Sequence, residues 1–561
     1  MDSFVDFYKV SSLAKVFDSE APEKCSEKLC GFKNEVIGFQ VAVRFDIPTE
    51  KKWPGPQRTV LKLKVNSPIA DYISIRKVVA VPSNVPAPVE RDEHYLKTES
   101  GLFPDVLRNL DDNTFILPLK QWHSLWVEID TKGEVNAGDY PISIALYDSL
   151  DEKLASIEET MTVFDAVLPK QRLIYTQWFH ADCLADYYKV EVFGDEHWHI
   201  IERFVKTAVD NGVNMIFTSL FTPPIDTSPE VIRTVVQLLH ITVENGEYRF
   251  DFSRLKKWVD MCKRCGIEYF EINHLFSQWG ADFCPNIFGF VNGEMHQLFG
   301  MKTPVTDIEY HRFLATLLPQ LINKLCEWGL KDKCWFHISD EPGKNHLKSY
   351  LFAKKLIEPY LGGFPIIDAL SDVDFYKYGV VKTPVCTTDH IEDFLPLDIP
   401  ELWAYYCGGQ SVDVSNRFMS MPSYRNRIIG IQLYKFSIRG FLHWGYNFYN
   451  SALSLKHLSP YEVTDADFAF ASGDAFSVYP GKEGNPEESI RARVFLYALQ
   501  DMRAFELLES LTDKESVVTL LEEAIEKPIT FKNYPHSDDY ILNVRQKVNQ
   551  EIIARCKMKL K

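Results

Sequence analysis

The amino-acid sequence predicts an α/β protein, in which an eight-stranded parallel barrel of the TIM type follows an antiparallel β-sandwich and precedes a smaller extension. Three observations indicate this fold. Short β-type runs fill the first part of the chain, strand-like and helical segments alternate in the middle, and helices dominate the end. At 561 residues the chain is too long for one ordinary domain of about 100–200 residues. We expect a sandwich over 1–168, a barrel over 169–450, and an extension over 451–561 whose strands and helices pack on the barrel.

The first 168 residues contain short runs in which apolar residues alternate or cluster. Turn residues separate these runs, for example Pro-Gly-Pro at 54–56 and Asp-Asp-Asn at 111–113. Regular short strands with such turns are typical of an antiparallel sandwich. No cluster of titratable residues stands out, so this part is predicted to be an accessory domain. The predicted strands cover 35–45, 58–66, 74–83, 124–130, 139–148 and 155–165.

The middle of the chain alternates between apolar strand-like runs and longer segments with helical periodicity. Two of these helical segments, 197–212 and 252–266, end at glycine, as helices commonly do. Eight such units over about 280 residues match a parallel eight-stranded barrel. An open doubly wound sheet is the alternative. That fold commonly has a glycine-rich turn after its first strand, and residues 178–182 contain no glycine. The predicted strands cover 172–180, 214–221, 267–276, 334–341, 364–371, 384–391, 401–407 and 440–449.

Two further helical segments are predicted within the barrel, at 304–329 and 423–440. After the last barrel strand, the extension is predicted to contain an extended stretch at 468–481. Helices are then predicted over 488–511, 514–526 and 539–561. The basic residues of the final helix are expected to form a solvated face.

Charge and hydropathy exclude several classes of function. The chain has 61 Lys and Arg against 78 Asp and Glu, a net charge of −17. Nucleic-acid binding needs clustered basic residues, and an acidic surface repels anionic membranes, so neither is an expected partner. The sequence contains no run of about 18 apolar residues, the length that a membrane-spanning helix needs. The N-terminal residues lack the pattern of a signal peptide. The oligomeric state is left open.

The cysteines indicate a reducing compartment, and we expect a cytoplasmic protein. There are 11 of them, an odd number spread thinly over the chain. Cys262 and Cys265 form a CxxC, but no second CxxC or nearby histidine pair completes a zinc set, which favours a structural role for both. No HxH or HExxH spacing occurs, and we expect neither a metal nor a cofactor. Metal ligands drawn from separate strands are an alternative that the sequence leaves open.

Asp340 and Glu341 are the sharpest chemical feature of the sequence. They are adjacent carboxylates that close an apolar strand, and Pro342 stops its continuation. Because two crowded like charges disfavour double ionisation, the pKa of one should rise, which gives an acid able to protonate a leaving oxygen. The alternative is that the pair caps the following helix. Its place at a barrel strand end, where active sites of this fold collect, favours the catalytic role.

Further polar and aromatic residues lie at the predicted strand ends and are expected to bind a substrate. Flat aromatic faces suit the C–H face of a sugar ring, and the polar groups can bond to hydroxyls. For the aromatic residues, packing inside the barrel is the alternative. The candidate substrate-binding residues are His180, Asp182, His274, Trp279, His337, Asp368, Trp403, Tyr405, Trp444, Tyr446 and Asn447.

Several strings in this sequence, taken together and in order, resemble glycoside hydrolase family 123 and the wider set of proteins called domain of unknown function 4091. The resemblance covers nearly the whole chain. The matching strings are GFKNEVIGFQVAV (31–43), GLFPDVL (101–107), YTQWFHADCLADYY (175–188), YFEINHLFSQWGA (269–281), FHISDEP (336–342), GFLHWGYNFYN (440–450), SGDAFSVYPG (472–481) and ESIRARV (488–494).

The resemblance implies a sandwich joined to a barrel, and release of β-linked N-acetylgalactosamine, with retention, from glycolipid-type glycans. It further implies substrate-assisted catalysis, in which the 2-acetamido oxygen of the sugar attacks and an oxazolinium intermediate forms. By motif, Glu341 would be the general acid and then the base for water, and Asp340 would orient the acetamido group. Two alternatives are a glycosidase for a sugar without an acetamido group and a non-catalytic carbohydrate-binding protein on the same fold.

Overall fold

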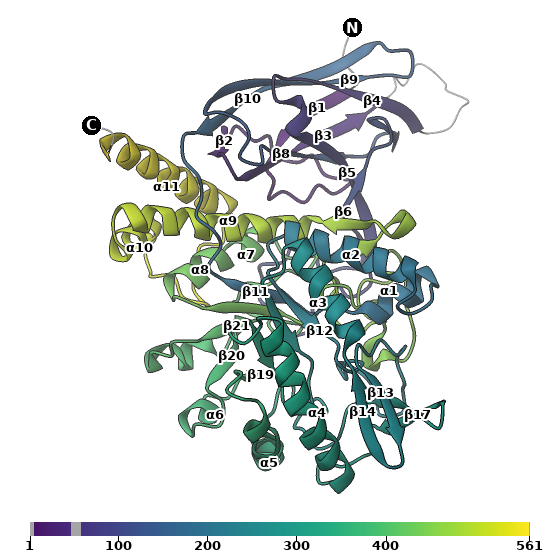
Figure 1. Ribbon diagram of the computed structural model, residues 1–561. Helices are drawn as coiled ribbons and strands as arrows, with labels where there is room; N and C mark the ends of the chain where they lie inside the picture. The colour runs from purple at the N-terminus through teal and green to yellow at the C-terminus, as the bar shows by residue number, and fades with distance from the viewer. Residues whose placement is uncertain (1–4, 47–57, 560–561) are drawn as a thin grey trace.

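The computed structural model describes residues 5–46 and 58–559 (Figure 1). The turn predicted at 54–56 and the last two residues of the predicted final helix lie outside this part. Its central element is a parallel sheet of eight strands in the order β18-β15-β12-β11-β22-β21-β20-β19. A parallel bridge between Phe336 and Ile366 joins the two end strands, so the sheet forms a nearly closed barrel and the predicted fold class is confirmed. The barrel strands are β11 Ile174–Gln177, β12 Met215–Thr218, β15 Tyr269–Ile272, β18 Cys334–Phe336, β19 Ile367–Leu370, β20 Thr383–Thr387, β21 Trp403–Tyr405 and β22 Gly440–His443.

Seven of the eight predicted barrel segments contain one of these strands, and the segment predicted over 384–391 overlaps β20, which begins one residue earlier. The strands are shorter than predicted. Their inward side chains form a closed apolar core that includes Met215, Phe217, Trp335 and Trp403. The helices around the barrel are α1 Ala181–Tyr188, α2 Asp195–Asp210, α3 Ser253–Cys265, α4 Ile308–Glu327, α5 Leu347–Ile357, α6 Asp374–Lys377, α7 Ser423–Arg427 and α8 Ile429–Lys435. The single helix predicted over 423–440 is therefore two short helices.

A small four-stranded sheet interrupts the barrel between β12 and α4, and the sequence analysis assigned no strands to it. Its order is β14-β13-β16-β17, with β13 pairing parallel to β16. The four strands are β13 His240–Glu244, β14 Glu247–Asp251, β16 Ile287–Val291 and β17 Glu294–Phe299.

The N-terminal part forms two sheets, in the orders β1-β3-β8-β5-β6-β24-β23 and β2-β10-β9-β4-β7. Apolar side chains such as Val41 and Val127 from the first sheet and Leu63 and Ile144 from the second form one core. The strands before the barrel are β1 Val5–Val10, β2 Leu29–Phe32, β3 Val36–Phe45, β4 Arg58–Asn66, β5 Ile73–Ser83, β6 Gly101–Asn109, β7 Thr114–Pro118, β8 His123–Asp130, β9 Gly138–Tyr147 and β10 Lys153–Phe164.

The C-terminal extension connects the sandwich to the barrel. β23 Val478–Pro480 and β24 Pro486–Ser489 complete the first sandwich sheet, and α9 Ile490–Leu511 then runs between sandwich and barrel (Figure 1). α10 Lys514–Glu522 and α11 Asp538–Lys559 follow. The stretch predicted as extended over 468–481 is mostly irregular, and β23 is its one strand in the described chain.

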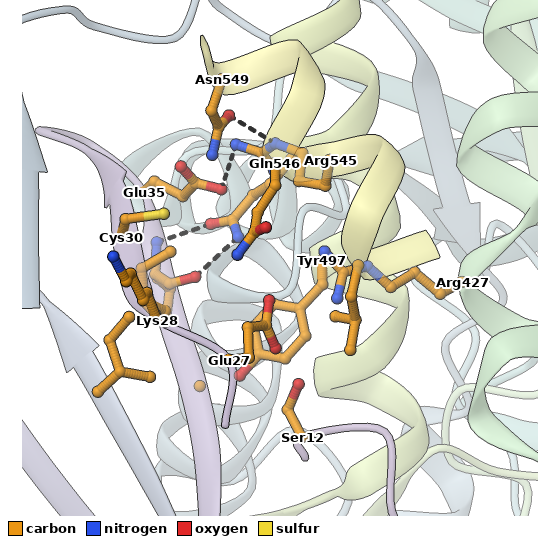
Figure 2. Close-up of a pocket in the computed structure, with 16 residues that line it drawn as sticks. Ser12, Glu27, Lys28, Cys30, Glu35, Arg427, Tyr497, Arg545, Gln546 and Asn549 are labelled. Atoms are coloured by element: carbon orange, nitrogen blue, oxygen red, sulfur yellow. Dashed lines mark hydrogen bonds and ion pairs between the residues drawn. The ribbon is translucent and has the colours of Figure 1, made fainter. Parts of the chain in front are cut away.

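Buried ion pairs join α11 to the N-terminal part of the chain and to α9. Figure 2 shows Arg545 of α11 reaching Glu35, at 2.6 Å, beside a small cavity of about 60 Å³. Arg545 also bonds to Asp501 of α9 at 2.8 Å. Among the described residues, no helix combines the length and apolarity needed to cross a membrane.

Candidate active site

A cavity of about 500 Å³ opens at the carboxyl ends of the barrel strands, and we call it the mouth cavity. Barrel strand ends supply most of its wall. The sandwich adds residues 85, 88 and 89, and the irregular stretch after the barrel adds residues 468–471 and 474. Its lining residues are Val85, Pro88, Val89, Trp178, Ile225, Asp226, Gln278, Trp279, Asp340, Glu341, Ala369, Tyr405, Cys407, Gly408, Gly409, Leu442, Trp444, Phe468, Ala469, Phe470, Ala471 and Asp474.

Asp340 and Glu341 both line the mouth cavity, although adjacent residues of a regular strand would point to opposite faces. The chain can do this because β18 ends at Phe336 and Glu341 adopts a left-handed backbone conformation with φ of +46°. The amide of Glu341 donates to the carbonyl of Ala369 at 3.1 Å and so fixes this turn. The next helical turn has Gly343 as its N-cap, so the alternative that the acidic pair caps it is wrong.

Each carboxylate of the pair accepts a hydrogen bond from a neutral side chain. Gln278 Nε2 donates to Asp340 Oδ2 at 2.8 Å, and the Tyr405 hydroxyl donates to Glu341 Oε1 at 2.6 Å. Burial, and then the charge of Glu341, hold the pKa of the Asp340 carboxyl well above its usual range. Burial also raises the pKa of Tyr405 well above 10, so its hydroxyl stays a donor at neutral pH.

Three of the predicted aromatic ligands, Trp279, Tyr405 and Trp444, line the mouth cavity. Trp279 is 48% exposed and therefore presents its ring to solvent. Trp444 donates its Nε1 hydrogen to Asp474 Oδ2 at 3.1 Å. Burial raises the pKa of the Asp474 carboxyl to about 7.

The other two predicted aromatic ligands, Trp403 and Tyr446, are not among the residues that line the cavity. Trp403 is fully buried in the barrel core, with its ring 6.1 Å from that of Trp335. Tyr446 is buried outside the barrel and donates its hydroxyl to the carbonyl of Phe204 at 2.8 Å. The packing alternative describes these two residues.

His180, Asp182 and Asn447 are buried and are not among the residues that line the mouth cavity; they hold the start of α1 against the segments that follow β12 and β22. Arg233 donates to both oxygens of Asp182, at 2.8 and 2.9 Å, and lies 3.1 Å from His180 Nδ1. Asn447 bonds to the amide and the carbonyl of His180 at 2.9 and 3.0 Å. Burial, and then the Arg233 charge, lower the pKa of His180 to about 4, so its ring is neutral at pH 7.

The last three predicted ligands, His274, His337 and Asp368, lie together in the closed barrel interior, and we call them the inner cluster. All three are completely buried. His337 Nε2 lies 2.9 Å from Glu271 Oε2, and its Nδ1 lies 3.4 Å from Asp368 Oδ1. Burial opposes a charge on His337, but the two carboxylates outweigh it and raise its pKa to about 9. The inner cluster is therefore not placed to touch a ligand in the mouth cavity.

The sequence analysis did not select several residues that line the cavity, among them Asp226, Gln278 and Asp474. Gln278 is held by a bond from the amide of Asp226 to its Oε1, at 2.8 Å. Asp474 lies in the string SGDAFSVYPG, which is part of the family resemblance but was predicted to be an extended stretch. The resemblance was the signal that could have placed Asp474 in the site.

Comparisons with known proteins bear on the identity of this site. A family model described as "Glycoside hydrolase 123, catalytic domain" matches residues 178–508, more than half of the chain and including the acidic pair. Among curated proteins, none matches.

The similar solved structures include a family 123 glycoside hydrolase from Clostridium perfringens, whose structural analysis concerns the details of glycolipid glycan hydrolysis. It is 14% identical over 100% of both chains, with a TM-score of 0.76, which supports the fold. A β-glucuronidase from Parabacteroides merdae is 12% identical over 89% of this chain and 52% of its own, but its TM-score of 0.29 is too low to support an inference. The match of the family model, which includes seven of the eight barrel strands and the acidic pair, establishes that this chain is a glycoside hydrolase and belongs to glycoside hydrolase family 123.

Proposed function

We propose that this glycoside hydrolase releases a terminal β-linked N-acetylgalactosamine with retention, and that the 2-acetamido oxygen of the sugar is the nucleophile. The observation that carries the proposal is that Asp340 and Glu341, adjacent in the chain, line one cavity. A retaining enzyme with its own nucleophile needs two carboxyl groups about 5–5.5 Å apart across the scissile bond, and substrate-assisted families are exceptions. Neighbours on one turn suit an acid and an orienting group on the same side, with attack left to the substrate.

In this mechanism Glu341 protonates the leaving oxygen and later removes a proton from water. The bond from the Tyr405 hydroxyl to Oε1 fixes the orientation of this carboxyl group and leaves Oε2 for the substrate. Asp340 accepts the acetamido N–H and stabilises the positive charge of the oxazolinium. Because Asp340 is only 6% exposed, this charge is stabilised in a poorly solvated setting, where electrostatic interactions are strong.

The rest of the mouth cavity suits a sugar. Trp444 and Trp279 supply flat faces, and the Asp474 carboxylate beside Trp444 can accept a bond from a hydroxyl. The similarity to the Clostridium perfringens enzyme supports glycolipid-type glycans as the natural substrates. All eleven cysteines are free thiols, which supports a cytoplasmic location as part of this proposal.

Three aryl glycosides test the proposal: the β-N-acetylgalactosaminide, the β-N-acetylglucosaminide and the β-galactoside. We expect release from the first alone, and NMR of the first product should show the β-anomer before mutarotation. Release from the β-galactoside would instead support a glycosidase that needs no acetamido group. Binding without any release, in a protein that melts cooperatively, would support a non-catalytic carbohydrate-binding protein.

A further inference from the structure

The inner cluster of His274, His337 and Asp368 has the composition of a metal site. One potential ligand atom from each residue lies within 4.8 Å of the other two, and all three side chains are completely buried. The residues follow or belong to β15, β18 and β19, which are consecutive around the barrel. Because each ligand comes from a different strand, the cluster lacks the short spacings by which zinc sites are recognised in a sequence.

The spacing between His337 and Asp368 is that of an ion pair and also that of two ligands of one cation. Their Nδ1 and Oδ1 atoms are 3.4 Å apart, longer than the usual 2.7–3.2 Å of an N–H···O bond. Two ligands at about 2.1 Å from a tetrahedral zinc ion are separated by about 3.4 Å.

His274 provides an independent observation. Within the described part of the chain, neither nitrogen of its fully buried ring has a hydrogen-bond partner. Buried polar groups without a partner are rare in folded proteins, and each calls for an explanation such as a bound ion. The His274 ring centroid lies 4.5 Å from that of His337, so the unpartnered nitrogens are close to the other two ligands.

Surrounding groups orient the ligands as they do in known metal sites. Glu271 faces His337 Nε2 at 2.9 Å, so this nitrogen donates its hydrogen and Nδ1 remains for a metal. Metal-binding histidines almost always donate their other N–H in this way. The Tyr350 hydroxyl and the Ile338 amide donate to Asp368, at 2.6 and 3.0 Å, and fix its carboxylate.

We propose that the inner cluster binds one divalent transition-metal ion, with zinc the favoured ion, through His274, His337 and Asp368. Two imidazoles and a carboxylate are a donor set typical of zinc. A divalent cation also balances the two buried carboxylates, Glu271 and Asp368. Binding forms metal–ligand bonds and displaces any proton on His337 Nδ1 to solvent, with no redox change. With three protein ligands, a water molecule would be the fourth ligand of a tetrahedral ion. Because none of the three residues lines the mouth cavity, the role of the ion is to hold the strand end three residues before Asp340.

Metal analysis of the full-length protein, purified without a histidine tag or chelator and supplied with zinc chloride, tests the site. We expect about one zinc ion per chain after dialysis. In the variants His274→Ala and Asp368→Asn, the zinc content should fall by at least about tenfold. His197→Gln is the matched control, because His197 is also fully buried but bonds to the carbonyl of Ala181, at 2.9 Å, outside the cluster. Its metal content should equal that of the wild type.

A cobalt titration of the chelator-treated wild-type protein keeps the test decisive if the variants fail to fold. We expect the visible absorption of four-coordinate cobalt to saturate at about one equivalent, with a rise in Tm. Wild-type protein that neither retains zinc nor shows this absorption would overturn the proposal, and the cluster would then be an ion pair of protonated His337 with Glu271 and Asp368. Zinc that persists in the His274→Ala variant would also overturn it, since the ion would then bind elsewhere. These readouts do not depend on glycosidase activity, so failure here leaves the proposed function unaffected.

Discussion

At the scale of single residues, the Glu341 side chain is positioned by its own backbone and by Tyr405. Glu341→Gln keeps the shape of the side chain but removes the proton donor. We expect kcat to fall by roughly 10²–10⁴ on natural glycans, the usual contribution of a general acid. Activated aryl glycosides should lose less, because a good leaving group needs little protonation. Equal losses on both substrates in steady-state assays would contradict the acid role.

Asp340 should set the acidic limb of the pH profile. In the proposed mechanism its ionised form is required, and burial and the Glu341 charge raise its pKa. Wild-type activity should therefore fall as the pH drops through this raised value. Asp340→Asn cannot titrate, so kcat should decrease and the acidic limb should move to lower pH. The kcat profile from pH 3 to 8 measures this, and an unchanged profile with near wild-type turnover would exclude the assignment.

Variants of two tryptophans, Trp444 and Trp403, distinguish a role in ligand binding from a role in core packing. Trp444→Ala should weaken the binding of a thiazoline inhibitor of oxazoline type, because Trp444 lines the mouth cavity. Trp403→Ala should instead lower the free energy of unfolding by about 3–5 kcal/mol, because Trp403 fills the barrel core. Melting temperatures and inhibitor affinities measured on both variants test the pair. Unchanged inhibitor affinity in Trp444→Ala would show that the sugar subsite lies elsewhere in the cavity.

The sequence located the aromatic strand ends but not their depth in the barrel. Trp403 and Tyr405 both point inward, two residues apart on β21, and only Tyr405 lies high enough to line the cavity. Tyr446 follows the end of β22 and turns outward to Phe204. Periodicity gives the face of a strand, but the layer depends on where the strand ends, which the sequence predicted several residues too late.

At the scale of elements, the late strand ends have a physical cause. After Phe336 the string continues with His337, Ile338 and Ser339, so the alternation of polar and apolar residues extends the predicted strand. In the structure the Ile338 amide bonds to the Asp368 side chain, at 3.0 Å, in place of a strand carbonyl. The four-stranded insertion was missed for a related reason. β17 is exposed along most of its length and lacks the apolar alternation that marks a half-buried strand.

α9 should stabilise the irregular stretch that carries Asp474. Arg491 of α9 is 2% exposed, pairs with Asp105 at 2.9 Å, and donates to the carbonyls of Gly473 and Phe476 at 2.6 and 2.8 Å. Arg491→Met leaves Asp105 buried without its ion-pair partner, although the Tyr479 hydroxyl still donates to it. The loss should cost about 3–5 kcal/mol of unfolding free energy. It should also raise KM, since Asp474 lines the mouth cavity.

Denaturant unfolding and steady-state kinetics on Arg491→Met measure both effects. Arg439→Met is the matched control, because Arg439 is 42% exposed and lies 3.7 Å from Glu401, which makes its ion pair weak. Its stability should stay close to that of the wild type. Equal, small losses in both variants would show that the Arg491 pair does not hold this stretch.

At the scale of the whole molecule, the sequence analysis predicted the order of the three parts but not how they are joined. The first sandwich sheet contains strands from both ends of the chain, since β24 pairs with β6. Residues 488 and 107 are paired, and the local sequence around either residue does not predict this pairing. Short-range patterns predict strands, whereas a pairing over such a separation depends on the complete fold.

The contacts between α9 and the sandwich predict that the sandwich and the barrel unfold together. Asp105 and Glu128 of the sandwich pair with Arg491 and Arg493 of α9, at 2.9 and 2.7 Å, and all four side chains are less than 10% exposed. Removing residues 1–168 would expose the apolar side chains of Ile490 and Val494, which pack against Trp126 of the sandwich. It would also remove both sandwich carboxylates, and the loss of several kcal/mol compares with a typical total stability of about 5–15 kcal/mol. We therefore expect one calorimetric transition for the full chain, coincident with the loss of circular dichroism and of activity. A fragment over 169–561 should not fold, whereas two separate transitions, or a soluble and active fragment, would show that the barrel is stable without the sandwich.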